Sequence, residues 1–530
     1  MENNERKWLP NLENSIPKEA YGYKLCMYTI ALEAWRRGLK VKFYNIYIDG
    51  KRRVRYTISN GEKKYEFAVS RGGKVTKEAT NICLDKALTK KYLKKGNVCI
   101  PMGYKFNKND SLESILQQLK NTPYPLVVKP VDSSAGRGVF TNITNNEELV
   151  EAITTLTDNL KVEDIIVEQY VQGSDYRIYV IGDKVVGAVT RVPAFVCGDG
   201  KLTVKQLIAE KNKKRKQNPY THGRLIKIDR DLKKHLKKTN ITLSYIPEKG
   251  ERINLREKSN VSSGGEPTEI TSELTENVKK LAVDAINAVP GLHQGAVDIV
   301  ADLKSDIGYV LEINSKAQIS MHTFPESGTA QDVPSAIIDY YFPETVNNKK
   351  INNSYFDFKS VLKPLENNLI KEVGIPSAPK LNYNAFKYTI CGKVQRVGYR
   401  NWVVKKAGAL QLNGFVQNIE NGSVQIIVSG KKNNLEEFDK IISDTAPRKA
   451  NVQDVTCEKY SRPVKLGFEI IRPNLTEKQV DRLIYENISL KKEYRKLLKK
   501  YNRVLKKYNS VLKSRAWKSI EFFRKLLGRS

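Results

Sequence analysis

Two groups of residues in this chain have the types and spacing that phosphate chemistry needs. The first joins Lys129, at the end of the apolar run Val127-Val128, to a Ser- and Gly-containing loop over 132–138. A fixed cation and backbone N–H groups that can approach phosphate oxygens are the two requirements for binding a triphosphate. This order of residues supplies both, and it predicts a nucleotide site.

Oxygen-bearing side chains follow at intervals. Glu168 ends a strand-like apolar run, and Asp175 lies seven residues beyond it, offering an acceptor for ribose hydroxyls beside an edge for adenine. Farther on come Asp298, and then Glu312 with Asn314. Residues at i and i+2 of a strand face the same side, where carboxylate and amide oxygens can bridge hard cations held by phosphates.

The second group is the stretch Gly392–Arg400, followed by Asn418 after the run Gly414-Phe415-Val416-Gln417. A Gly-rich turn that closes with an arginine at the start of a predicted helix forms an anion cradle, because N–H groups, a helix N-terminus and a guanidinium converge there. By this chemistry alone the cradle could bind any phosphate or carboxylate.

Several folded units must position these groups, since 530 residues exceed what one hydrophobic core usually supports. The patterns predict a multidomain chain of α/β and α+β type. Its parts are an N-terminal α/β region over 1–80, an α/β domain over 81–343, a linker rich in Asn, Lys and Pro over 344–384, a compact α+β domain over 385–472 and a long basic helix over 475–530.

Hydrophobic periodicity identifies the main elements. It predicts helices over Tyr23–Gly38, Glu147–Leu156 and Ser272–Val289, and strands over Val41–Ile48 and Arg53–Ile58. The compact domain before residue 472 reads as strand, helix, strand, strand, helix, strand.

Charge and cysteine usage narrow the class of protein. The formal net charge is +33, and residues 475–530 hold 17 basic against 5 acidic residues. The six cysteines are scattered without a Cys-x-x-Cys pair, the N-terminus is polar, and no run of about 18 apolar residues occurs. We therefore expect a reduced protein in the cytoplasm, with peripheral contact to a membrane as an option for the basic tail.

The tail keeps a seven-residue period, with one column running from Ile484 to Leu512 and another from Val480 to Tyr508. This pattern is typical of a coiled coil through which the chain would self-associate, and a single amphipathic helix packed on the body is the alternative. The aromatic and apolar residues near Trp517 fit either an anionic membrane surface or a hydrophobic cap. Nucleic acid is disfavoured as a partner because no recognised binding module accompanies the charge.

In their order along the chain, the residues of the first group resemble the ATP-grasp superfamily, most closely the ATP-grasp portion of cyanophycin synthetases, over about residues 80–343. The resemblance extends to the stretches 196–208, 253–256, 260–265 and 322–328. It implies an ATP-grasp fold that activates a small-molecule or peptide carboxylate as an acyl phosphate, which an amine then attacks. Cyanophycin synthetases continue into a domain related to the Mur ligases, and nothing here resembles it, so cyanophycin is not the expected product.

The same resemblance assigns roles residue by residue. It implies that ATP is held by Lys86, Lys129, Ser133, Ser134, Gly136, Gly138, Glu168, the backbone near Val171, and Asp175. It implies two Mg²⁺ ions, with Mn²⁺ as a substitute, on Asp298, Glu312 and Asn314. It places Arg191, and comparably Arg177, at the acyl phosphate, and His322 in a position that faces substrate.

Residues 385–472 resemble acylphosphatase, on the motifs Gly392–Arg400 and Gly414–Asn418. This implies a ferredoxin-like βαββαβ domain in which Arg400 and loop amides bind phosphate and Asn418 orients the attacking water. Two positions depart from the family pattern, since Arg396 replaces a Gly and Tyr399 replaces a Phe. If position 396 needs a positive φ, arginine would strain the loop by about 1–3 kcal/mol, and its cation could help to hold a larger acyl phosphate.

Together these features predict a bifunctional enzyme, an ATP- and Mg²⁺-dependent carboxylate–amine ligase fused to an acylphosphatase. The alternative from another class is an envelope- or membrane-associated scaffold in which one or both enzyme folds only bind ligand. Its basis is the tail segment Leu512–Lys518, which resembles the termini of some glycan-assembly proteins.

Overall fold

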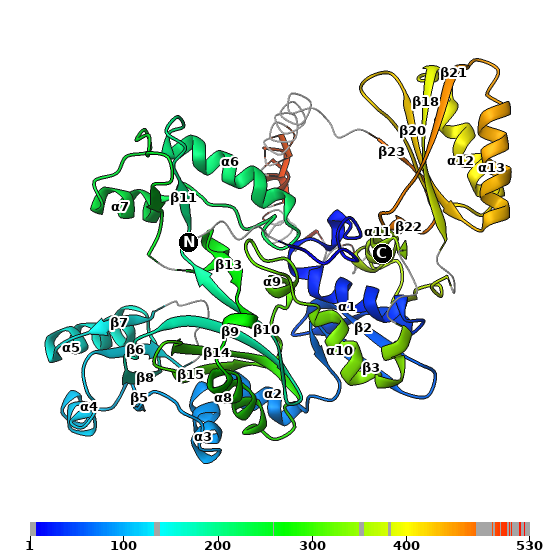
Figure 1. Ribbon diagram of the computed structural model, residues 1–530. Coiled ribbons are helices and arrows are strands. Elements are labelled where there is room, and N and C mark those ends of the chain that lie inside the picture. The colour runs from blue at the N-terminus through cyan, green and yellow to red at the C-terminus, as the bar shows by residue number, and fades with distance from the viewer. Residues whose placement is uncertain are drawn as a thin grey trace.

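The computed structural model describes residues 7–131, 138–257, 259–348, 354–379 and 383–472, with scattered positions between 490 and 524. Sheets of four or five strands form the frame of its folded units, and helices cover them (Figure 1). The multidomain α/β and α+β architecture predicted from the sequence is present.

The N-terminal unit consists of a buried helix and an antiparallel sheet. Helix α1 (Leu25–Arg36) precedes strands β1 (Lys40–Ile48), β2 (Lys51–Ser59), β3 (Lys64–Ala68) and β4 (Arg71–Gly72). All twelve residues of α1 are buried, since its sequence is apolar on nearly every side. The predicted helix and the two predicted strands of this region are confirmed, and their bounds differ from the predicted ones by no more than two residues.

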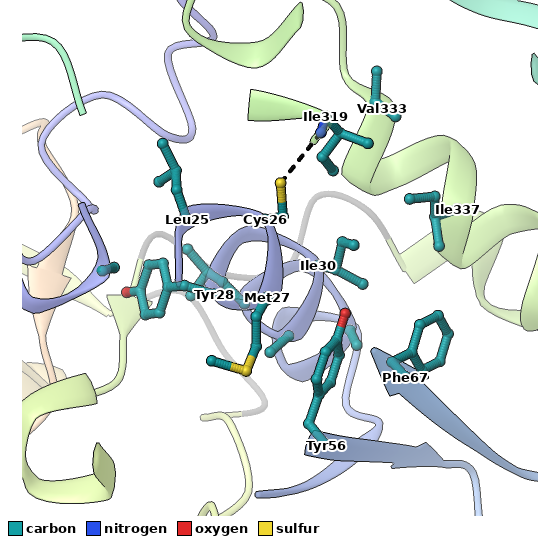
Figure 2. Close-up of a cluster of buried hydrophobic side chains, with 14 of the residues drawn as sticks. Leu25, Cys26, Met27, Tyr28, Ile30, Tyr56, Phe67, Ile319, Val333 and Ile337 are labelled. Carbon is teal, nitrogen blue, oxygen red and sulfur yellow. Dashed lines mark hydrogen bonds between the residues drawn. The ribbon is translucent and has the colours of Figure 1, made fainter. Parts of the chain in front are cut away.

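The core of this unit extends well beyond residue 80. Helix α10 (Val333–Tyr341) and Ile319 pack against α1 in one hydrophobic cluster (Figure 2). The backbone N–H of Ile319 donates a hydrogen bond of 3.2 Å to Cys26 Sγ, in the middle of that cluster. The N-terminal region therefore shares a core with the end of the following domain, because a helix that is apolar all round needs packing partners on more than one side.

The segment 344–384 differs from the expected linker. It contains strand β16 (Ser354–Tyr355), helix α11 (Phe358–Glu366) and strand β17 (Glu372–Gly374), which pairs antiparallel with β1. The buried residues of α11 are Phe358, Val361, Leu362 and Leu365. Their i, i+3, i+4, i+7 spacing is that of a helix face, and burying this face in the N-terminal core outweighs the polar composition around it.

We expect Phe358→Ala to lower the free energy of unfolding by about 3–5 kcal/mol, because it empties a fully buried ring site. The ring of Phe358 lies 5.0 Å from that of Tyr28 and 5.6 Å from that of Phe43, between centroids. Urea unfolding followed by tryptophan fluorescence measures the change. Lys359→Ala, at the exposed neighbouring position, is the control. Equal stability of the two variants would mean that α11 is a linker after all.

The next domain contains two sheets. The larger has the strand order β13-β10-β9-β14-β15, and helix α8 (Glu276–Asn287) covers one of its faces. Its strands are β9 (Ser174–Ile181), β10 (Lys184–Val192), β13 (Glu266–Glu269), β14 (Gln294–Asp302) and β15 (Ile307–Asn314). Alternate residues of β9 and β14 enter the core beneath α8, which leaves the intervening side chains on the opposite face.

The smaller sheet has the order β5-β8-β6-β7, with helices α4 (Leu112–Leu119) and α5 (Asn146–Thr154) packed on it. Its strands are β5 (Gly103–Asn107), β6 (Leu126–Pro130), β7 (Phe140–Ile143) and β8 (Asp164–Gln169). Helices α2 (Lys77–Leu84) and α3 (Lys86–Lys95) lead into it. A small unit is inserted after β10; its elements are β11 (Phe195–Cys197), α6 (Val204–Gln217), α7 (Arg230–Lys238) and β12 (Arg252–Asn254).

The last described domain has the predicted order of strand, helix, strand, strand, helix, strand. The elements are β18 (Asn384–Lys393), α12 (Tyr399–Ala409), β19 (Asn413–Asn418), β20 (Val424–Gly430), α13 (Lys432–Asp444) and β21 (Asn451–Lys459). A further strand, β23 (Phe468–Ile471), adds to the edge in parallel with β19. The short strand β22 (Val464–Lys465) pairs with β16, so the domain is joined to the N-terminal unit by backbone hydrogen bonding.

The predicted coiled coil over 475–530 lies outside the described residues, apart from scattered helical positions. Among the residues that the structure describes, no helix is both long and apolar enough to cross a membrane.

Candidate functional site

Two lysines and one buried glutamate form the cationic part of the first site. Lys129 extends from β6 and Glu168 from the adjacent strand β8, whereas Lys90 comes from α3. The ammonium groups of Lys129 and Lys90 donate to the two carboxylate oxygens of Glu168, one to each. Two cations on one anion leave a net positive charge, which suits phosphate binding.

The two lysines of this group favour the ionised form of Glu168. Burial raises the pKa of Glu168, but the charges of Lys129 and Lys90 outweigh burial and hold that pKa below its usual range. Burial lowers the pKa of Lys90, and Glu168 opposes this effect. The sequence reasoning missed Lys90, although its position one helical turn after Lys86 was the available signal.

The other predicted nucleotide contacts are partly outside the described residues. Ser133, Ser134 and Gly136 fall in the part of the loop, 132–137, that the structure does not describe. Gly138 has a φ of +67°. Lys86 Nζ lies 3.5 Å from the carbonyl oxygen of Pro130, next to Lys129.

Val171 follows β8 and is half-buried. The amides just before it are used within the fold, since Gln169 N–H donates to Met102 O and Tyr170 N–H to Pro125 O, both at 2.8 Å. A contact between the backbone near Val171 and ATP stays a prediction.

The three predicted metal ligands lie together on the face of the larger sheet opposite α8. Asp298 of β14 is directly opposite Glu312 of β15. Asn314 Nδ2 lies 3.1 Å from Glu312 Oε1, to which it donates, and 3.5 Å from Asp298 Oδ2. Arg177 of β9 donates two hydrogen bonds of 2.7 Å to the carboxylate of Asp298. Two carboxylates and an amide oxygen form a donor set that fits Mg²⁺.

The pKa values of the two carboxyl groups in this set are shifted in opposite directions. Burial would raise the pKa of Asp298, but the bidentate Arg177 holds it well below its usual range. Burial, followed by the charge of Asp298, raises the pKa of Glu312. A divalent cation would stabilise the ionised form of a carboxyl that is buried beside another anion. The raised pKa of Glu312 is therefore consistent with the fit of this donor set to Mg²⁺.

This pair predicts a pH-dependent stability. Since the pKa of folded Glu312 is raised, its contribution to stability is complete below its ordinary pKa and is lost as pH rises through the raised value. At pH 8 without divalent cations, Glu312→Gln should therefore raise the melting temperature by roughly 2–4 °C.

The same variant should lose the rise in melting temperature that Mg²⁺ produces in the natural chain. Differential scanning calorimetry with EDTA and with Mg²⁺ measures both effects. Glu276→Gln, at an exposed position of α8, is the control. A Mg²⁺ response that Glu312→Gln leaves unchanged would remove Glu312 from the metal site.

Asp175 and Arg191 belong to this second group of charges. Asp175 precedes Arg177 by two residues on β9, on the same face. Burial raises the pKa of Asp175, Arg191 lowers it, and Asp298 raises it again. Within the described residues no hydrogen bond or ion pair joins Asp175 to Lys129 or Glu168. Arg191 carries a buried Nε with no hydrogen-bond partner in the described chain, so this donor is available to an anionic ligand.

His322 is completely buried, and its Nδ1 lies 3.5 Å from Oε2 of Glu269, which is also buried. It packs directly over Gly187 of β10, where an added Cβ would come within 2.9 Å of the ring. The ring therefore lies against strand β10 of the larger sheet and is not exposed.

The second site is the loop between β18 and α12. Gly398 has a φ of +84° and occupies the N-cap of α12, so that the helix N-terminus and Arg400 in its first turn open onto the loop. A cavity of about 410 Å³ lies here, lined by Val394, Arg396, Gly398, Tyr399, Arg400, Asn401, Ile470 and Arg472. A cavity lined by three arginines at the N-terminus of a helix is suited to binding an anion.

Asn418 lies beside this loop without lining the cavity. The side chain of Gln395 donates to the carbonyl oxygens of Ile419 and Ser423, both at 2.9 Å, and so fastens the loop to the β19–β20 hairpin. Asn418 is the residue before Ile419, and its Oδ1 is buried without a partner in the described chain. The geometry brings Asn418 next to the cradle with an acceptor free for a ligand or water.

Arg396 has a φ of +61°, in the left-handed region. The conditional prediction of strain at this position is therefore confirmed: a residue with a side chain stands where backbone geometry favours glycine, at a cost of about 1–3 kcal/mol.

Family models match one segment in each half of the chain. Residues 83–202 match the family model described as a RimK-like ATP-grasp domain, and residues 386–470 match the model described as acylphosphatase. The chain thus carries an ATP-grasp domain and a ferredoxin-like acylphosphatase domain. The predicted metal ligands Asp298, Glu312 and Asn314 lie beyond the first match.

Relatives cover only parts of this chain. Cyanophycin synthetase of Crocosphaera subtropica is 31% identical over 271 residues, which are 50% of this chain and 31% of that protein. The glutathione biosynthesis bifunctional protein GshAB of Clostridium perfringens is 30% identical over 296 residues, 54% of this chain and 37% of that protein. The crystal structure of acylphosphatase from Bacillus subtilis shows 27% identity and a TM-score of 0.16, covering 17% of this chain and 98% of that one. The chain spans about a third of the length of the curated relatives it matches.

Proposed function

We propose that the protein is an ATP- and Mg²⁺-dependent carboxylate–amine ligase fused to an acylphosphatase. The ligase proposal rests on the arrangement of two groups of charged side chains within an ATP-grasp domain. A net-positive Lys129–Glu168–Lys90 group lies on the smaller sheet. On the larger sheet, the oxygen donor set of Asp298, Glu312 and Asn314 lies on the face opposite α8, together with Arg177 and Arg191.

In the ligase half, the lysines draw the phosphates of ATP to the smaller sheet, and Asp298, Glu312 and Asn314 would hold Mg²⁺. When bound there, the metal ion would offset the negative charge of the phosphates. The substrate carboxylate takes the γ-phosphoryl group of ATP, leaving ADP. An amine then forms the C–N bond, the acyl C–O bond breaks, and phosphate and a proton leave. Arg191 Nε, a buried donor without a partner in the described chain, would donate to the anionic intermediate.

In the phosphatase half, Arg400 and the loop amides hold the phosphoryl group. Asn418 orients a water molecule, whose oxygen forms the new bond to phosphorus as the bond from phosphorus to the acyl oxygen breaks. The products are a carboxylate, inorganic phosphate and a proton. We also infer that this half removes acyl phosphate that the ligase half has made but not used.

Screening ADP release against pairs of carboxylates and amines tests the ligase. Turnover with one pair, dependent on both members, supports it; no turnover above the no-carboxylate background with any amino acid, dicarboxylate or short peptide would sink it. For the link between the halves, hydroxylamine traps acyl phosphate as a hydroxamate. The hydroxamate yield should increase in Arg400→Ala if the phosphatase consumes the ligase's intermediate, and an unchanged yield would separate the two activities.

The scaffold interpretation rests on the tail, which lies outside the described residues. It stays a prediction from the sequence, as do self-association and the membrane surface.

A further inference from the structure

We propose that the acylphosphatase site recognises acyl phosphates whose acyl part bears a second negative charge, a carboxylate, through Arg396 and Arg472. This inference rests on the proposed phosphatase function and names its substrate class. Its starting observation is that three of the eight residues lining the cavity are arginines and none is acidic.

The three arginines come from different parts of the domain. Arg400 lies in the first turn of α12, Arg396 in the loop before it, and Arg472 directly after β23. None of them forms an ion pair with a carboxylate of the described chain. Three uncompensated guanidinium groups around one cavity repel each other, so an anionic ligand with more than one charged group would stabilise the arrangement.

One phosphoryl group does not need all three. The N-terminus of α12, the loop amides and Arg400 would together suffice to hold one phosphoryl group. Arg396 and Arg472 are exposed, whereas Arg400 is half-buried, so they stand at the mouth of the cavity, where the acyl group must leave the cradle. Two guanidinium groups at this mouth are suited to a distal carboxylate.

The position of Arg472 is set by the sheet. Strands β19 and β23 run parallel, and their last paired residues are Gln417 and Ile471, which directly precede Asn418 and Arg472 in the sequence. The adjacent β23 residue on the same face as Arg472 is Ile470, which lines the cavity. The paired ends of β19 and β23 therefore bring Arg472 to the same end of the sheet as Asn418, the residue proposed to orient water.

The backbone at Arg396 supports a role in the site. Its φ of +61° is a conformation that glycine adopts freely and arginine adopts at a cost. Strain of this kind persists where the surrounding structure imposes it, and it is concentrated at ligand sites.

The test compares hydrolysis of three substrates by the full chain: benzoyl phosphate, and the two compounds of matched shape 4-carbamoylbenzoyl phosphate and 4-carboxybenzoyl phosphate. We expect kcat/KM for the carboxy substrate to exceed that for the carbamoyl substrate by about tenfold at low salt, and the ratio to fall in 1 M NaCl. Arg472→Gln and Arg396→Gln should each reduce this ratio by about threefold or more. Lys440→Gln, on the exposed side of α13, should leave the ratio as it is.

A ratio near one in the natural chain, or one that both arginine variants retain, would overturn the inference while leaving the phosphatase intact. If no substrate is hydrolysed, the proposed phosphatase fails, and recognition is decided by titration calorimetry with 4-carboxybenzylphosphonate against 4-carbamoylbenzylphosphonate. Equal affinity for the two phosphonates would then overturn the inference as well. Arg472→Gln, at an exposed strand end, keeps the test valid if Arg396→Gln does not fold.

Discussion

Lys129→Met should lower kcat/KM for ATP-dependent ADP release by about 10²- to 10³-fold. In the natural chain, Lys129 and Lys90 share the carboxylate of Glu168, and the group carries a net charge of one positive unit. Methionine keeps the aliphatic stem but leaves Lys90 and Glu168 as a neutral pair. The positive charge that would attract and hold the phosphates is then lost, whereas the buried acid keeps a partner and the fold is preserved.

The measurement is a coupled assay of ADP release with whichever carboxylate and amine pair supports turnover. Lys105→Met is the matched control, because Lys105 lies on β5 of the same sheet and pairs with Asp164 at 2.9 Å near the surface. It should change the rate less than twofold, since exposed ion pairs contribute little. Turnover in Lys129→Met at the level of Lys105→Met would show that Lys129 does not act on ATP.

Arg400→Ala should reduce kcat/KM for benzoyl phosphate by about 10³-fold, and Asn418→Ala should reduce kcat by about 10²-fold. Arg400 is the guanidinium at the N-terminal turn of α12, where it lines the cavity with the loop. Arg400→Lys should restore little of the activity, because an ammonium group cannot form two parallel hydrogen bonds to a phosphoryl group. The Asn418 side chain offers a buried acceptor beside the loop, so its loss should appear in the chemical step.

Continuous assay of benzoyl phosphate hydrolysis by absorbance measures these effects. Lys405→Gln serves as the control, as it lies on the same helix with an exposed side chain. Hydrolysis that proceeds equally in the Arg400→Ala and Lys405→Gln variants would contradict the assignment of this loop as a catalytic site.

Much of the site was predictable because the signals are local. The loop ending in Arg400 combines a strand end, glycines and a helix start within nine residues, and this order alone indicates an anion cradle. Glu312 and Asn314 were predictable for the same reason, since alternation along one strand places them on one face. Even the strain at Arg396 followed from the family pattern, and a φ of +61° confirms it.

The linker and the first domain boundary were predicted wrongly, because packing between distant segments outweighed the local composition. The Asn, Lys and Pro content of 344–384 indicated a linker, but four apolar residues of α11 at helical spacing are buried in the N-terminal core. Composition averages over a segment, whereas burial depends on the few side chains that face a partner. The boundary near residue 80 failed in the same way, because α1 required packing from α10, some 300 residues later.

The sequence by itself determined which chemistry each segment can support, because residue type and spacing along one strand or loop set donor sets and anion cradles. Only the tertiary structure decided which distant residues act together. It placed Lys90 on Glu168, Arg177 on Asp298, and Arg472 at the cavity that Arg400 lines. Each of these pairs joins elements separated in sequence, and its electrostatic interaction exists only once the sheets have brought the side chains together.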